Sequence, residues 1–141
     1  MLRKQSSDKD PGDWFYSGSD RLRVADLAWA QEGLTQSGIE LLQEAVERYL
    51  KGYLVAKNCA LKKTHDLDVL LIEAMRYDSR FNQFQNLADE LTRDFFAQHY
   101  PGGDWNDIGK NYKDLRNQTG AMIDLIEQSL PQFFPKPTNS K

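Results

Sequence analysis

One stretch of the sequence decides the fold class: Ile39-Glu40-Leu41-Leu42-Gln43-Glu44-Ala45-Val46-Glu47-Arg48-Tyr49-Leu50-Lys51-Gly52-Tyr53-Leu54. Its apolar side chains recur at spacings of three and four residues, which places them on one wide face of an α-helix about four turns long. Gly52 lies inside this helix at a cost of roughly 1 kcal/mol relative to alanine, which is understandable where another helix crosses closely. The stretch therefore predicts a long amphipathic helix at the centre of a helical core.

The rest of the chain repeats the helical spacing and shows no strand-like alternation over four or more residues. Good N-caps, prolines and glycines mark the ends of the expected elements. Besides the central helix, we expect helices from Ser19 to Gly33, from Thr64 to Ala74, from Asp78 to Pro101 and from Asp104 to Pro131. The predicted fold class is therefore all-α, a compact up-and-down bundle of about five helices joined by short loops.

The length of 141 residues suits one domain, and 16 aromatic residues are enough to fill one small core. Residues 1–13 are polar and contain a Pro-Gly pair, so we expect a disordered N-terminal tail. Residues 131–141 contain three prolines and are expected to form a flexible C-terminal tail. The helical domain is then expected at 14–130, with the aromatic trio Trp14-Phe15-Tyr16 closing one end of the bundle or contributing to a dimer face.

The cysteine content and the hydropathy pattern bear on the compartment. A single cysteine, Cys59, cannot form an internal disulfide, which favours a reducing environment. No window approaches the roughly 18 consecutive apolar residues of a membrane span, and the first residues lack the apolar stretch of a signal peptide. We therefore expect a cytoplasmic protein without a membrane partner.

Three strings in a fixed order carry a family resemblance. The helix at 43–54 is followed about ten residues later by Lys63-Thr64-His65-Asp66-Leu67, and a later helix ends at His99-Tyr100-Pro101. This order resembles the HEPN domain family, in which a helix of the type Gln-Gln-Ala-Val-Glu-Lys-x-Leu-Lys-Ala precedes a Thr-His-Asp-Leu turn and a later helix ends at Arg-Tyr-Pro. Val24-Ala25-Asp26-Leu27-Ala28 is similar to the family's first helix, so the resemblance covers residues 14–130. The departures are Glu44 for the second Gln, Arg48 for Lys, and His99 for Arg.

The resemblance has consequences for function. It implies a bundle of about five helices that commonly forms homodimers and is linked to nucleotides or RNA. Many such domains are encoded beside a minimal nucleotidyltransferase, which suggests an enzyme of that kind as a partner. Some branches of the family are metal-independent ribonucleases that act in toxin–antitoxin pairs.

The ribonuclease branches use an arginine followed, after four to six residues, by a histidine. The arginine stabilises phosphate charge, and the histidine assists transfer of the 2'-hydroxyl proton. Arg93 and His99 have this spacing. On a continuous helix, however, positions six residues apart differ by about 120° in direction, and the likeness to the Arg-Tyr-Pro corner explains His99 without catalysis. A catalytic pair and a coincidence of spacing both stay open.

The charge is unevenly distributed along the chain. The net charge is -3, but residues 47–63 carry +4 and the remainder carries -7. The candidate phosphate ligands are Arg48, Lys51, Lys57, Lys62, Lys63 and His65. In the alternative interpretation, Arg48 and Lys51 pair with glutamates four residues earlier on a solvated helix face. His65 lies at a helix start that favours anions, although Asp66 and Asp68 in the same turn oppose them.

Two histidines and one cysteine cannot assemble a zinc site, and neither a calcium loop nor a phosphate loop is present, so no metal or cofactor is expected. The leading hypothesis is a non-catalytic, dimeric HEPN-type module associated with nucleotide binding or with a nucleotidyltransferase. The alternatives are a ribonuclease toxin that uses Arg93 and His99, and a purely structural dimerisation domain.

Overall fold

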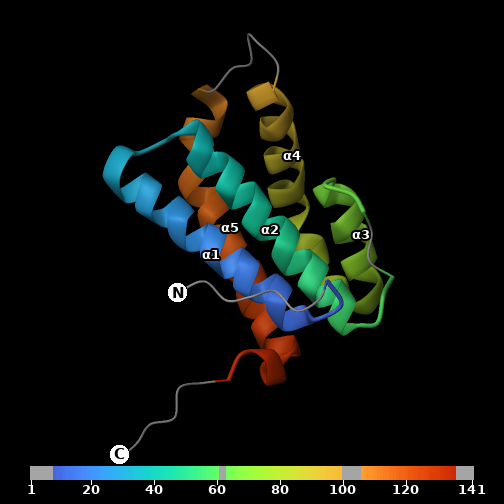
Figure 1. The fold of residues 1–141 in the computed structure, drawn as a ribbon. Coiled ribbons are helices and arrows are strands. Elements are labelled where there is room, and N and C mark those ends of the chain that lie inside the picture. Colours follow the sequence, from blue (N-terminus) through green and yellow to red (C-terminus); the bar gives the residue numbers. More distant parts are fainter. Residues whose placement is uncertain (1–7, 61–62, 100–105, 136–141) are drawn as a thin grey trace, which may run out of the picture.

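In the computed structural model the backbone is described at residues 8–60, 63–99 and 106–135, and the side chains of 93–99 and 106–110 lie outside the description. Within these ranges the chain forms five α-helices, two short 3-10 helices and no strand (Figure 1). The elements are α1 Pro11–Glu32, α2 Gln36–Ala56, α3 Leu67–Tyr77, η1 Ser79–Phe84, α4 Gln85–His99, α5 Asn106–Ser129 and η2 Pro131–Phe133. The predicted all-α bundle of five helices is confirmed.

Helix α1 begins at Pro11. The predicted start at Ser19 is therefore wrong. Asp10 caps the helix by accepting a hydrogen bond from Gly12 N at 2.9 Å. Pro11 fits the first turn because its missing N–H would have no partner within the helix. The small residues at 17–19 look like a helix cap in the sequence, but tertiary packing keeps them helical, and Gly18 is buried.

The other helix starts differ from the prediction by a few residues. Thr35 accepts a hydrogen bond from Gly38 N and caps α2, so residues 36–38 belong to the helix and not to a connecting loop. Asp66, and not the predicted Thr64, caps α3 by accepting from Asp68 N at 2.9 Å. The expected helix after Asp78 begins as η1 and continues as α4.

Helices α1 and α2 pack antiparallel along most of their length, with α2 in the middle of the bundle (Figure 1). The close crossing predicted at Gly52 is present, because the ring of Phe15 on α1 lies against it. Tyr49 lies in the same way against Gly18 of α1. Side chains larger than hydrogen at these two glycines would separate the helices.

The core is built around α2, which buries apolar side chains on a wide face. The fully buried large side chains of α2 are Ile39, Leu42, Leu50, Tyr53 and Leu54. They pack against a second set from α3, η1, α4 and α5, namely Leu67, Leu70, Leu71, Phe81, Leu87, Leu91 and Leu115. No helix within the described ranges combines the length and the apolarity that a membrane crossing requires.

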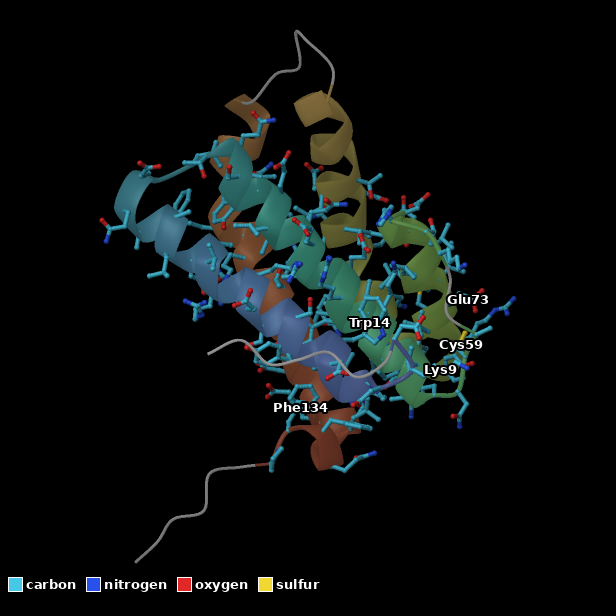
Figure 2. All side chains as sticks on the ribbon, in the orientation of Figure 1. Lys9, Trp14, Cys59, Glu73 and Phe134 are labelled. Carbon is cyan, nitrogen blue, oxygen red and sulfur yellow. The ribbon has the colours of Figure 1, made fainter. Side chains whose placement is uncertain are left out.

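The C-terminal turn closes the end of the bundle where α1 begins (Figure 2). The rings of Phe133 and Phe134 lie 5.9 and 4.7 Å from the ring of Phe15. These residues fall in the segment that the sequence assigns to a C-terminal tail, because Pro131 ends the helical periodicity there. Aromatic packing, which follows no helical period, attaches the turn at η2 to the domain.

Candidate functional site

The six candidate phosphate ligands lie along the second half of α2 and in the connection to α3. Arg48 is engaged between α1 and α2: its Nε donates to Ser17 Oγ at 2.9 Å, and its Nη1 lies 3.5 Å from Glu44 Oε1. Burial, together with the nearby charge of Arg21, lowers the pKa of Arg48. The guanidinium therefore ties two helices together and faces other protein groups.

Lys51 is enclosed in the fold. Its Nζ donates to Glu47 Oε2 at 2.9 Å, and the two side chains are only 7% and 5% exposed. The indole ring of Trp14 covers the ammonium group, which lies 5.6 Å from the ring centroid. The four-residue ion pairs expected from the sequence, Glu44 with Arg48 and Glu47 with Lys51, are both present.

His65 is attached to this buried pair from the outside. Its Nδ1 lies 3.0 Å from Glu47 Oε2 and 3.2 Å from Oε1, whereas 80% of its side chain is exposed. With the proton on Nδ1, the ring donates to the carboxylate and its Nε2 edge points away from Glu47. Sequence spacing could not reveal this contact, because the two residues are 18 positions apart and belong to different elements.

The remaining cations lie on the α2–α3 connection. Lys57 ends α2 with its Nζ 5.5 Å from the ring centroid of Tyr53, and Lys63 is exposed. Lys62 lies outside the described residues. The predicted set is therefore divided: two members are engaged inside the bundle, Lys57 is half-buried at the end of α2, and Lys63 and His65 are exposed on the connection.

The two acids that could oppose an anion near His65 are engaged elsewhere. Asp66 accepts a hydrogen bond from Asp68 N at the start of α3. This cap occupies an N–H group at the helix start that the sequence predicted to be favourable for an anion. Asp68 turns toward α4, where Gln85 Nε2 donates to it at 2.8 Å. Desolvation and a shared hydrogen bond with Asp89 raise the pKa of Asp68 to about 6. Both carboxylates thus have partners away from the imidazole.

The candidate catalytic pair lies on α4, whose backbone is helical from Gln85 through His99. The side chains of Arg93 and His99 lie outside the described residues, so their pairing stays a prediction. Among the residues with described side chains, no three of the types His, Cys, Asp and Glu gather as metal ligands would.

Residues 12–128 match the family described as HEPN domain, which is most of the chain. Neither the curated proteins nor the solved structures contain a match to the chain. The match agrees with the all-α bundle and with the order of the sequence strings on α2, at the start of α3 and after α4. The chain therefore belongs to the HEPN domain family, whose members are nucleotide-related or ribonuclease-type helical modules.

Proposed function

We propose that this protein is a non-catalytic, dimeric HEPN module that binds a nucleotide through its phosphate at the α2–α3 connection and acts beside a nucleotidyltransferase. The observation that carries the proposal is the arrangement of this connection. Lys63 and His65 are exposed there beside the half-buried Lys57, while the neighbouring Asp66 and Asp68 make hydrogen bonds to other groups. Cationic side chains that reach solvent are what a phosphate ester needs.

The charge distribution supports the same location. Residues 47–63 carry +4, and the two cations of this segment on the helix body are compensated by Glu44 and Glu47. The positive charge that Glu44 and Glu47 leave uncompensated therefore lies on the lysines at and after the end of α2, where it is available to a ligand. An anion bound there would also reduce the repulsion among them.

Ligand-dependent thermal unfolding tests the proposal. AMP, ATP and a short single-stranded RNA are each added to the wild-type protein at low salt, and a ligand specific to the native state raises the Tm. The variant K57Q/K62Q/K63Q should lose this rise. The control K110Q/K113Q/K136Q removes the same charge elsewhere in the sequence and should keep it. An equal rise in all three proteins would contradict the location, and no rise with any ligand would favour a purely structural dimerisation domain.

The dimer and the partner need separate measurements. Sedimentation equilibrium of the purified protein is expected to give twice the monomer mass, and a monomer at all concentrations would contradict the dimer. The partner is tested by co-purification with a nucleotidyltransferase encoded beside this gene, if the genome has one. A complex that survives washing at low salt would support this part of the proposal.

A further inference from the structure

We infer that the buried carboxylate of Glu47 positions His65 to bind a phosphate group in its protonated form, so that an anion of constant charge, such as a phosphodiester or sulfate, binds this site more tightly as the pH falls. The inference rests on the proposed function, because it concerns the same α2–α3 connection. It adds a specific ligand group, a positioning residue and a dependence on pH.

The geometry fixes one edge of the imidazole, and no hydrogen bond from the described residues reaches the other edge. Nδ1 lies 3.0 and 3.2 Å from the two carboxylate oxygens of Glu47, whose side chain is 5% exposed. That carboxylate cannot easily turn away, because Lys51 Nζ holds it at 2.9 Å and Trp14 covers Lys51. Because the buried anchor is rigid and the ring of His65 is exposed, the opposite nitrogen, Nε2, faces solvent in a defined direction.

The protonation state decides what Nε2 offers to an anion. The imidazolium donates one N–H to Glu47 and the other to a ligand oxygen, which makes a charge-assisted hydrogen bond. The neutral ring, with its proton held on Nδ1 by Glu47, directs a lone pair at the ligand, and a lone pair repels an anion. The ring therefore changes from acceptor to cationic donor when it is protonated.

The charged groups around His65 do not cancel the positive charge that the ring gains on protonation. On α2, Glu47 and Lys51 form an ion pair with no net charge. Near His65 in the sequence, Lys63 is exposed, and Asp66 is turned toward the first turn of α3. Asp68 turns toward Gln85 and Asp89 of α4. Trp14, which covers Lys51, adds no charge, so protonation of His65 changes the local charge by a full unit.

Sulfate is the probe of choice, because it keeps its double negative charge over the whole range in which histidine titrates. Its affinity is measured with the wild-type protein by NMR titration, with both histidines labelled and H99Q used to assign the signals. Between about pH 8 and about pH 5.5 the affinity should rise about tenfold, as expected for gaining one charge-assisted hydrogen bond. Saturating sulfate should shift the ring signals of His65 and leave those of His99 unchanged.

Three variants separate the contributions. H65Q should bind sulfate weakly and with the same affinity at every pH. H65K should bind tightly, but without the pH dependence, because its charge persists across the range. The double variant E47Q/K51M keeps the local net charge and removes the anchor, so the rise in sulfate affinity at low pH should shrink; a merely structural role of Glu47 would leave that pH dependence unchanged.

The outcomes distinguish this inference from the proposed function. Binding of nucleotide and sulfate that is independent of pH and equal in the wild type and H65Q would overturn the inference and leave the proposed lysine site intact. Absence of any binding to the wild type would overturn both. AMP and a short single-stranded RNA, tested in parallel with sulfate, show whether the phosphate ester of a free nucleotide or that of a polynucleotide is preferred.

Discussion

Gly52 of α2 lies directly beneath the ring of Phe15 of α1: a Cβ added to Gly52 would lie 2.5 Å from Phe15 Cε1. The same ring contacts Tyr49 at 5.8 Å and Phe134 at 4.7 Å between ring centroids. One residue in the first turns of α1 thus joins the central helix to the C-terminal turn. The glycine is required for this arrangement, because the ring occupies the space of a side chain.

We expect G52A to destabilise the protein, although alanine is the better helix former. Overpacking of a close helix contact typically costs about 1–3 kcal/mol, which outweighs the roughly 1 kcal/mol gained in helix propensity. Urea unfolding followed by circular dichroism measures the change. The control is G120A on α5, where the nearest atom to an added Cβ is Arg116 Nη1 at 3.4 Å. If G52A is as stable as the wild type, the contact is looser than the structure indicates.

The sequence predicted the central helix and its close crossing, but it could not predict which helix crosses or where α1 begins. A glycine inside an otherwise regular apolar pattern is visible locally. By contrast, Ser17 and Gly18 are held in the helix by contacts with Arg48 and Tyr49, which are residues of the next helix. Local propensity favours a cap there, and tertiary contacts override it.

Asp26 and Arg116 link α1 to α5 across 90 residues of sequence, with hydrogen bonds of 2.8 and 3.0 Å. The hydrogen bonding of the Arg116 guanidinium to the Asp26 carboxylate is the main cause that raises the pKa of Arg116. A double-mutant cycle with D26N and R116Q should give a coupling of about 0.5–1 kcal/mol, because both side chains are partly exposed. The coupling should fall in high salt. The pair Asp20–Arg23, whose arginine is more exposed, is the control, and an equally small coupling in both pairs would mean that the bidentate geometry adds nothing.

The ionisation of Asp68 should make the free energy of unfolding fall as the pH rises. Its folded-state pKa is raised to about 6 by desolvation and by Asp89, whereas an unfolded aspartate titrates near pH 4. The folded chain therefore retains a proton that the unfolded chain releases, and this stabilising contribution is lost as the pH rises from about 4 through about 6.

The variant D68N tests this assignment. At neutral pH it should raise the Tm by about 2 °C relative to the wild type, and the difference should vanish near pH 4. D124N removes an exposed carboxylate from α5 and serves as the control, with no such pH-dependent difference. A D68N variant that is less stable than the wild type at neutral pH would show that the carboxylate is stabilising when ionised.

The site was only partly predictable from the sequence. The positive segment and the four-residue ion pairs are local features, so counting charges along the helix revealed them. The contact between Glu47 and His65 and the cover of Trp14 over Lys51 join separate elements, and only the packed structure brings them together. Charge counting also could not separate cations engaged inside the bundle, such as Arg48, from those left toward solvent.

The proposed non-catalytic function predicts that the purified protein leaves RNA intact. Incubation with a long single-stranded RNA, with and without chelator, should give no cleavage above that of a buffer control. Cleavage that disappears in both R93A and H99A would instead establish the ribonuclease alternative. Cleavage that persists in both variants would point to a contaminating nuclease, which a second purification step can remove.

Removing one partner of the buried pair of Glu47 and Lys51 should destabilise the protein more than replacing both partners. K51M leaves a carboxylate that is 5% exposed with the exposed His65 as the cation in contact with it, so we expect a loss of about 3 kcal/mol. E47Q/K51M removes both charges and should recover most of that loss, because two neutral side chains of similar shape replace the pair. Urea unfolding above the titration range of histidine makes the comparison cleanest, since a neutral His65 cannot compensate Glu47 there. If both variants lose the same stability, the packing of the lysine stem against Trp14, and not its charge, is what stabilises the fold.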